Sequence, residues 1–255
     1  MEHRMGSDGG DNVAQVPRVL RLPGVYRPQE DTALLVEAVR GLRMTADTAV
    51  LDVCTGSGAV ALAAASAGSR NVTAVDISLA SVWSARCNAW LRGYRCLDVR
   101  RADITGFRFG GRFNLIVCNP PYVPTPSSAR TRGADRAWNA GPSGRALLDP
   151  LCRSLPSMLA DGGRLLMVQS ECADIDRTVA ELAQRCADAR VVARRRIPFG
   201  RIMSDRTGYL GGAGLLPDLP DGRNTPSEEI AVIEAVAAVR WPALEPAESP
   251  SALRG

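Results

Sequence analysis

The stretch that decides the fold is Leu51-Asp52-Val53-Cys54-Thr55-Gly56-Ser57-Gly58-Ala59-Val60-Ala61. An apolar run leads into a glycine turn, and small residues that favour a helix follow the turn. Gly56 and Gly58 allow the backbone to pass close to a bound ligand, because glycine has no side chain in the way. This order of strand, turn and helix is typical of the first ligand-binding unit of a doubly wound α/β domain.

Short β-like runs alternate with helical runs on both sides of that stretch, and two of the apolar runs end at Asp76 and Asn119. The alternation predicts an α/β fold: a Rossmann-like, doubly wound, seven-stranded sheet that is mostly parallel with an antiparallel last strand. The last strand is expected at 228–238, which is rich in β-branched residues. Thr225-Pro226-Ser227-Glu228 also resembles the start of a helix, so the sequence leaves both readings open.

The chain length suits one large domain, which we expect to span residues 16–240. Polar tails are expected at 1–15 and 241–255. Two segments, 123–143 and 200–226, are rich in Pro, Gly, Ser or Arg and are expected to be long loops or insertions.

The composition narrows the class of protein. No run of about 18 apolar residues is present, so no membrane span is expected, and the polar N-terminus does not resemble a secretory signal. A cytoplasmic protein is therefore predicted. The net charge of +4 comes with a bias toward arginine across the whole chain, and it is too mild to indicate nucleic-acid binding by itself.

Residue types exclude several kinds of chemistry. The only histidine, His3, lies in the expected tail, which argues against hydrolases that use a folded-domain histidine. The seven cysteines are scattered without a Cys-x-x-Cys pair, so neither a disulfide framework nor a metal site is predicted.

The glycine turn fits two cofactors. Gly56-x-Gly58-x-x-Ala61 satisfies a dinucleotide fingerprint, with Asp76 about 20 residues further on. Asp52, however, places a carboxylate just before the turn, where a pyrophosphate would need backbone N–H groups instead. A carboxylate suits a ligand that carries an ammonium and a sulfonium group, so the predicted cofactor is S-adenosyl-L-methionine, with NAD as the alternative.

Two further aspartates are candidates for binding the nucleoside part of this cofactor. Asp76, followed by Ile77, is expected to accept hydrogen bonds from the ribose hydroxyls. Asp103 is expected to accept one from the adenine amino group, while Ile104 packs on the ring.

Asn119-Pro120-Pro121-Tyr122 directly follows the strong apolar run at 113–118 and is the candidate catalytic and substrate-binding element. An amide or aromatic-amine nitrogen is a poor nucleophile because its lone pair is delocalised. The Asn119 side-chain oxygen and the Pro120 carbonyl are expected to accept N–H hydrogen bonds and to orient such a nitrogen. The two prolines stiffen the turn, and Tyr122 is expected to pack against the planar group.

These motifs together resemble class I methyltransferases of the HemK/PrmC type, which methylate the glutamine of the Gly-Gly-Gln motif in peptide-chain release factors. The segment Tyr26-Arg27-Pro28-Gln29-Glu30-Asp31-Thr32 is similar to the family's segment that closes over the cofactor, which implies a role for Thr32. Asp31-Thr32 is also expected to cap a helix that includes 34–39. The stretch 138–145 resembles the family's loop after the tetrapeptide.

Three departures from the family pattern stand out. Cys54 replaces the usual first glycine, so its backbone contact with the cofactor is expected to be crowded. Only about 50 residues precede the glycine turn, so the helical N-terminal domain of the bacterial enzymes is not expected, and the chain in this respect resembles the short eukaryotic and archaeal branch that works with a small activating subunit. The insertion 200–226 matches nothing in the pattern.

The leading reading is therefore a protein-glutamine N5-methyltransferase that acts on release factors. The alternative is a nucleic-acid base methyltransferase for adenine N6 or guanine N2, with Arg130, Arg132, Arg136 and the run Arg194-Arg195-Arg196 contacting phosphates. An NAD-dependent oxidoreductase and a cofactor-binding module without catalysis are weaker readings.

Overall fold

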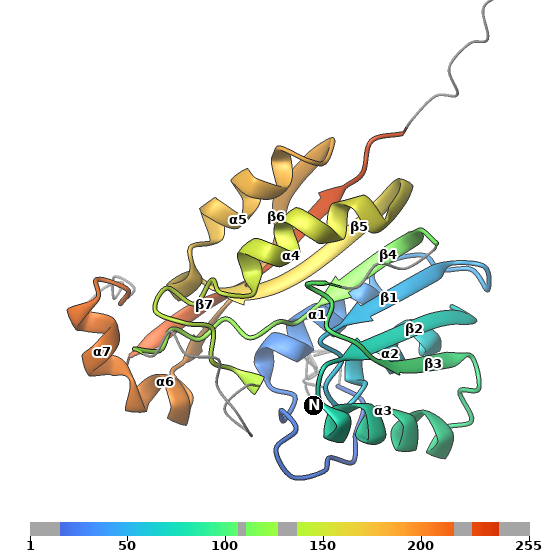
Figure 1. Cartoon of the computed structure of the whole chain (residues 1–255), viewed down its shortest axis with the longest axis horizontal. Helices are drawn as coiled ribbons and strands as arrows, with labels where there is room; N and C mark the ends of the chain where they lie inside the picture. The colour runs from blue at the N-terminus through green and yellow to red at the C-terminus, as the bar shows by residue number, and fades with distance from the viewer. Residues whose placement is uncertain (1–15, 107–110, 127–136, 217–225, 240–255) are drawn as a thin grey trace, which may run out of the picture.

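The computed structural model describes residues 16–106, 111–126, 137–216 and 226–239. These residues form one seven-stranded sheet in the order β3-β2-β1-β4-β5-β7-β6. The strands are β1 (Ala49–Val53), β2 (Asn71–Asp76), β3 (Leu97–Arg101), β4 (Phe113–Cys118), β5 (Leu159–Ser170), β6 (Asp188–Pro198) and β7 (Ser227–Val236). The first five run parallel to one another, and β7 lies antiparallel between β5 and β6, which confirms the predicted fold class (Figure 1).

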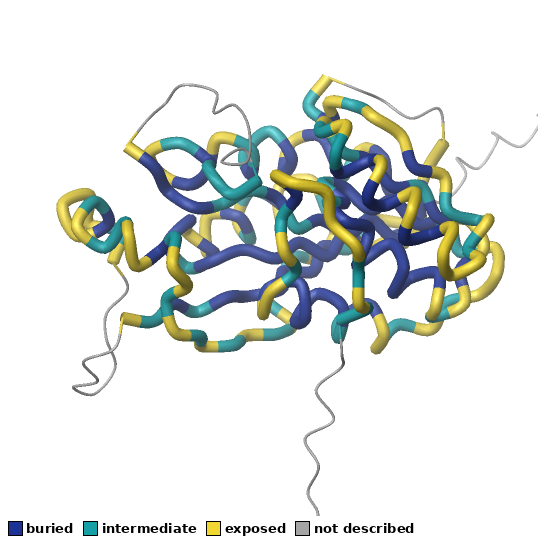
Figure 2. Tube along the Cα trace, turned by 90° about the horizontal axis from the view of Figure 1, so that it is seen from below, coloured by how far each residue is buried: buried dark blue, intermediate teal, exposed yellow. Residues whose placement is uncertain are grey.

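Helices cover both faces of the sheet. One face carries α1 (Glu30–Arg40), α2 (Ala59–Ser66) and α3 (Leu79–Leu91), and the other carries α4 (Leu148–Ser154), the 3-10 turn η2 (Leu155–Met158) and α5 (Ile175–Ala183). Each face has its own buried apolar cluster, so the central strands are enclosed on both sides (Figure 2). Burial on both faces explains why the other residues of β1 are all apolar, with Asp52 the exception, instead of alternating with polar residues.

Strand pairing shows whether the last element is a helix or a strand, a choice that the sequence left open. Residues 227–236 form strand β7, whose two edges bond to β5 and β6. The helix-like start at Pro226 cannot compete with two full ladders of backbone hydrogen bonds. The preferred strand reading is therefore confirmed.

The segment 200–226 is not simply a loop, and this part of the prediction is wrong. Its described part contains two short helices, α6 (Arg201–Asp205) and α7 (Thr207–Gly212), while residues 217–225 lie outside the described residues. Met203 and Leu210 are buried against Val123, and this packing stabilises the helices. Several glycines in this stretch, Gly208, Gly211 and Gly212 among them, weaken its helical pattern in the sequence.

The other predicted loop, 123–143, is anchored at both described ends. Val123 donates its N–H to the Trp138 carbonyl, and Ala140 donates to the Val123 carbonyl. The predicted tails at 1–15 and 241–255 lie outside the described residues. No helix in the described part of the chain has the length and apolar character needed to span a membrane.

Candidate active site

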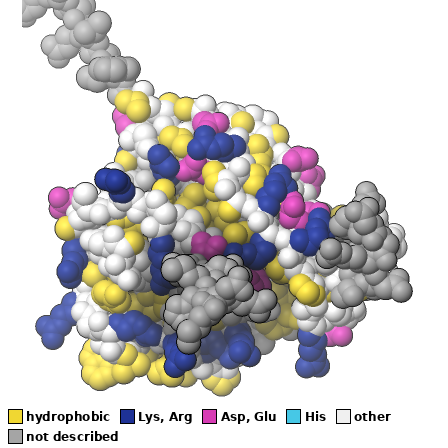
Figure 3. All heavy atoms as spheres, turned by 180° about the vertical axis from the view of Figure 1, so that it is seen from behind, with side chains coloured by type: hydrophobic (Ala, Val, Ile, Leu, Met, Phe, Trp, Pro, Cys, Tyr) yellow, Lys and Arg dark blue, Asp and Glu magenta, His cyan; other side chains and the backbone are white. Residues whose placement is uncertain are grey.

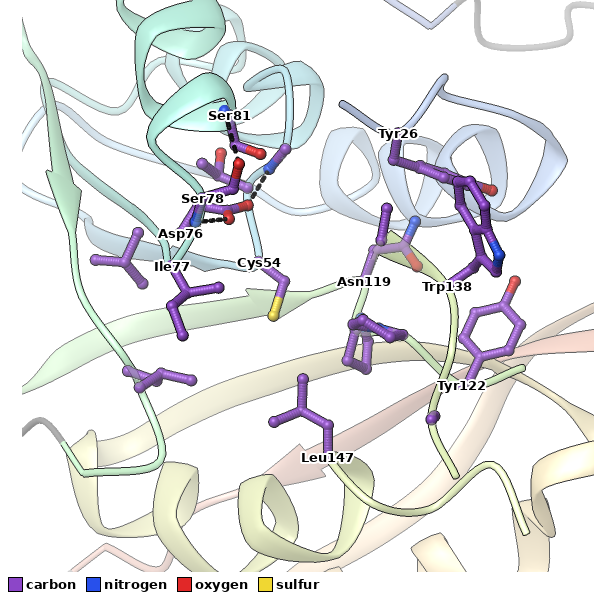
Figure 4. A pocket seen from close by; sticks show the side chains of 18 of the residues that line it. Tyr26, Cys54, Asp76, Ile77, Ser78, Ser81, Asn119, Tyr122, Trp138 and Leu147 are labelled. Carbon is purple, nitrogen blue, oxygen red and sulfur yellow. Dashed lines mark hydrogen bonds between the residues drawn. The ribbon is translucent and has the colours of Figure 1, made fainter. Parts of the chain in front are cut away.

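A cavity of about 760 Å³ lies beyond the carboxyl ends of β1, β2 and β4. This is where open parallel sheets place their ligands. The predicted site residues that line it are Thr32, Asp52, Cys54, Gly56, Asp76, Ile77, Asp103, Ile104, Asn119, Pro120, Pro121 and Tyr122. In Figure 4, Asp76, Ile77 and Cys54 lie on one side of the cavity, and Asn119 and Tyr122 lie on the other. Residues from five separate stretches of sequence thus meet at one site.

The glycine turn has an unusual backbone. Cys54, Gly56 and Gly58 all adopt positive φ angles, of 59°, 54° and 85°. For Cys54 this left-handed conformation costs about 1–2 kcal/mol relative to glycine. Gly58 does not line the cavity: a Cβ there would lie 3.1 Å from the Cβ of Ala85, so it is glycine because the turn packs tightly on α3.

Asp52 is buried at the end of β1, with 1% of its surface exposed. Its Oδ2 accepts hydrogen bonds from the Thr55 hydroxyl at 2.6 Å and from the Ala61 N–H at 2.9 Å. Burial raises the pKa of this carboxyl to about 7, against the lowering effect of the two hydrogen bonds. A nearby cation would favour its charged form.

Asp76 and Asp103 both accept hydrogen bonds from nearby backbone N–H groups. Asp76 accepts the Gly56 N–H at 2.9 Å and the Ser78 N–H at 2.8 Å, so it ties the glycine turn to the start of α3. Ser78 caps that helix, as its side chain accepts the Ser81 N–H. Asp103 is exposed and accepts the N–H and the hydroxyl of Thr105. A carboxylate oxygen can accept more than one hydrogen bond, so these contacts do not by themselves exclude a further one.

Asn119 is held by residues at the start of α1. Its Nδ2 donates to the Asp31 carboxylate at 3.0 Å and to the Thr32 hydroxyl oxygen at 3.2 Å. Asp31 is not the helix cap that the sequence predicted: the helix begins at Glu30 after Gln29, and no side chain caps it. The Asp31 carboxylate accepts from the N–H of the next residue, Thr32, and from side chains in the site.

Sequence reasoning assigned no site role to Tyr26, Asp31 or Trp138, which all line the cavity. The Tyr26 and Tyr122 hydroxyls donate to Asp31 at 2.9 and 3.2 Å. Burial raises the pKa of both tyrosines well above the usual value, and the Asp31 charge raises it further. Both hydroxyls therefore remain protonated donors. The signal was the resemblance of residues 26–32 to the family segment, which pointed only to Thr32.

The arginine run on β6 is already engaged with carboxylates. Arg194 pairs with Glu229, Arg195 pairs with Glu37 at 2.8 Å and with Glu30 at 3.0 Å, and Arg196 pairs with Glu171 at 3.2 Å. On the face shown in Figure 3, arginine and acidic side chains are interspersed. The other arginines suggested for phosphate contacts, at positions 130, 132 and 136, lie outside the described residues.

Comparisons with known proteins indicate the family to which a chain with this site belongs. The model of the family described as "Methyltransferase small domain" matches residues 18–133. A release factor glutamine methyltransferase from Xylella fastidiosa is 35% identical over 185 residues, which cover 68% of this chain and 67% of the relative. Methyltransferase HEMK2 from Mus musculus is 32% identical over 155 residues, covering 56% of this chain and 71% of the relative. The chain belongs to the HemK/PrmC-type class I methyltransferases.

Further relatives of this HemK/PrmC-type chain differ in length. A protein from Methanocaldococcus jannaschii named for N5-glutamine methylation is 29% identical, over 71% of this chain and 90% of its own. In contrast, the chain spans about half the length of the release factor glutamine methyltransferases from Mycolicibacterium smegmatis and Deinococcus radiodurans, 53% and 52% respectively.

One solved structure has a fold similar to that of this HemK/PrmC-type chain. The T. thermophilus 16S rRNA methyltransferase RsmC, in complex with AdoMet and guanosine, aligns with a TM-score of 0.55 at 19% identity. The alignment covers 85% of this chain and 46% of RsmC, and it supports the shared fold.

Proposed function

We propose that this HemK/PrmC-type chain is an S-adenosylmethionine-dependent methyltransferase that modifies the side-chain amide of a glutamine in a protein, such as a peptide-chain release factor. One observation carries the proposal. The residues suited to a cationic nucleoside cofactor and the Asn-Pro-Pro-Tyr tetrapeptide, suited to a planar nitrogen, line the same cavity.

The residues of the cavity fit this cofactor. Asp52 is a buried carboxylate whose charged form needs a cation, and only its Oδ2 takes part in the hydrogen bonds to Thr55 and Ala61. Asp76 and Asp103 line the cavity with two more carboxylates, and Ile77 and Ile104 line it with apolar surface. When bound, S-adenosylmethionine supplies an electrophilic methyl group on a sulfonium sulfur, which passes to nitrogen as that nitrogen releases one proton to solvent.

The acceptor side fits an amide nitrogen. Among the described residues, Asn119 is held through its Nδ2, so its Oδ1 is left to accept a substrate N–H. The Pro120 carbonyl offers a second acceptor beside it. Two acceptors fixed in a rigid turn hold an NH2 group in one orientation, which lowers the entropic cost of reaching the transition state.

Nucleic-acid bases also carry planar nitrogens, but the ion pairs of the β6 arginines do not favour phosphate binding there. A dinucleotide is disfavoured by the buried Asp52 at the turn. The similarity to HEMK2 and to the archaeal relative also makes a small activating subunit part of the proposal, to be tested by adding candidate partners to the assay.

The test is methyl transfer with the purified full chain, labelled cofactor and a release factor that contains Gly-Gly-Gln. We expect label on the glutamine, none after a glutamine-to-glutamate change in the substrate, and none with Asn119→Ala. Glu30→Ala, on the exposed start of α1, is the matched control and should stay active. Cofactor binding without transfer to any Gly-Gly-Gln protein, alone or with a partner, would reject the proposed substrate.

A further inference from the structure

We propose that Asp31 is a positioning residue: it locks the Asn119 amide in one of its two orientations, and the site thereby accepts a glutamine amide and rejects a glutamate carboxylate. The consequence for substrates rests on the proposed function. The lock itself is a statement about this chain alone.

The lock follows from the atoms around the Asp31 carboxylate. Its Oδ2 accepts from Asn119 Nδ2 at 3.0 Å, from the Tyr26 hydroxyl at 2.9 Å and from the Tyr122 hydroxyl at 3.2 Å. Its Oδ1 accepts from the Thr32 N–H at 2.6 Å. A carboxylate has only acceptors to offer, so the Asn119 atom that faces it must be the NH2 group. A reversed amide would bring two oxygens together in a buried place.

The carboxylate is itself held firmly. Asp31 is 3% exposed and lies in the first turn of α1, where the helix dipole favours a negative charge. Both tyrosine hydroxyls remain protonated, because burial and the neighbouring charge raise their pKa well above the usual value. Since each of these donors is satisfied by Asp31, the Tyr122 hydroxyl is turned toward the carboxylate and does not compete for the substrate.

Orientation determines what the site can bind. With Nδ2 turned inward, Asn119 presents Oδ1 as an acceptor next to the Pro120 carbonyl. An amide NH2 can satisfy both acceptors, whereas a glutamate carboxylate has no proton to donate and would face oxygen atoms only. If Asp31 is removed, the amide can turn over and offer its NH2 group to a carboxylate. Discrimination between glutamine and glutamate should then fall together with the rate.

The first test needs no substrate. In the full-length chain, the Asn119 side-chain NH2 signals are assigned in ¹⁵N NMR spectra by their loss in Asn119→Ala. We expect them to be protected from solvent exchange in the wild type and in the control Glu30→Ala, and to exchange in Asp31→Ala. Protection that is unchanged in a folded Asp31→Ala would overturn the lock, whatever the enzyme methylates.

The second test measures selectivity. Peptides with Gly-Gly-Gln or Gly-Gly-Glu are compared by binding in the presence of S-adenosylhomocysteine and by turnover. We expect kcat of Asp31→Ala to fall about 100-fold, with cofactor affinity retained, and the Gln-over-Glu binding preference to fall by roughly tenfold or more. Asp31→Asn removes the charge but keeps an oxygen where the two tyrosine hydroxyls favour one, so it should retain most of the preference.

The outcomes separate the explanations. Equal loss of preference in Asp31→Asn and Asp31→Ala would show that charge, not orientation, rejects glutamate, and would overturn the inference. So would a loss of cofactor affinity as large as the loss of kcat. If the wild type binds neither peptide, the proposed substrate is wrong, while the NMR experiment still decides whether Asp31 fixes the amide.

Discussion

Gly144 lies directly against the carbonyl oxygen of Tyr122, so that a Cβ at position 144 would collide with it. The same Cβ would also press on Ala173 at 3.2 Å, and Gly144 has a φ of 73°, which favours glycine. The loop after the tetrapeptide thus folds back and fixes the backbone that carries Tyr122. The two prolines stiffen the tetrapeptide, and this contact with Gly144 stiffens it further.

Gly144→Ala should therefore impair both stability and catalysis. We expect the free energy of unfolding to fall by about 1–3 kcal/mol, because the left-handed backbone and the clash both oppose a side chain. Methyl transfer should fall more steeply than cofactor affinity, since the tetrapeptide moves and the glycine turn does not. Chemical denaturation and cofactor titration measure the two effects.

The matched control is Gly208→Ala in α7, where a Cβ meets no atom within 4 Å. In a helix this change should raise stability, by up to about 1 kcal/mol. Equal stability of the two variants would contradict the close contact between Gly144 and Tyr122.

Cofactor affinity should depend on pH through Asp52. Burial raises the pKa of Asp52 to about 7 in the protein without ligand, so much of it is protonated below that pH. A cationic ligand favours the charged carboxylate, and binding therefore releases a proton. The affinity for S-adenosylmethionine should rise up to about tenfold per pH unit below 7 and level off above it. Calorimetry between pH 5.5 and 8.5 checks this.

Asp52→Asn is the control for that profile. The variant keeps an oxygen for the Thr55 and Ala61 donors but cannot ionise, so its affinity should be lower above pH 7 and should vary less with pH. A profile as steep as that of the wild type would assign the pH dependence to another group.

Glu228 makes stability depend on pH in the opposite sense from an ordinary surface acid. Burial, with a smaller contribution from the charges of Asp31 and Glu171, raises its pKa from 4.5 to about 7 against the lowering effect of the hydrogen bond from Ser170. The folded state therefore binds a proton more tightly than the unfolded state does. The contribution of Glu228 is fully present below pH 4.5 and is lost as pH rises through 7, at a cost of up to about 3 kcal/mol.

Glu228→Gln should remove this loss, so its advantage over the wild type should grow from pH 4.5 to 7.5 in urea denaturation. Glu229→Gln, the neighbouring residue on β7, is the control, because Glu229 is partly exposed and pairs with Arg194. If both variants follow the same pH profile, Glu228 is not the group responsible.

How much of this site was predictable depends on how far apart in sequence its residues lie. Asp52, Asp76 and Asn119 could be assigned because parallel strands end at one edge of the sheet, and each residue sits at or near such an end. Asp31 could not, because its partners Asn119 and Tyr122 are 88 and 91 positions away. Its local context, an acid at a helix start, favoured a capping role that the structure does not show.

The same limit applies to α6 and α7. Nothing near residue 206 in the sequence indicates that these helices hold the loop beside the cavity, because the contact joins segments more than 60 positions apart. The strand β7 was undecided for a related reason: its own residues allowed a helix or a strand, and only pairing with β5 and β6 excludes the helix.

Arg206 should matter for the protein substrate and not for the cofactor. Its guanidinium donates to the Pro124 carbonyl at 2.7 Å and to the Asn139 side-chain oxygen, so it bridges the two described ends of the loop that follows the tetrapeptide. Arg206→Lys keeps the charge but cannot reach both acceptors with one planar group. KM for the release factor should rise about tenfold through the loss of roughly 1.4 kcal/mol, a loss in the range of a hydrogen bond to a charged group.

The dissociation constant of the cofactor should stay unchanged in Arg206→Lys, because Arg206 is not among the residues that line the cavity. Arg201→Ala, which removes an exposed arginine at the start of α6, controls for a general effect of charge on this end of the molecule. A rise in KM with Arg201→Ala but not with Arg206→Lys, which keeps its charge, would mean that charge at this end of the sheet, rather than the bridge from Arg206, attracts the substrate. A rise confined to Arg206→Lys would instead assign the α6–α7 segment a positioning role in substrate binding, acting through the loop that it holds.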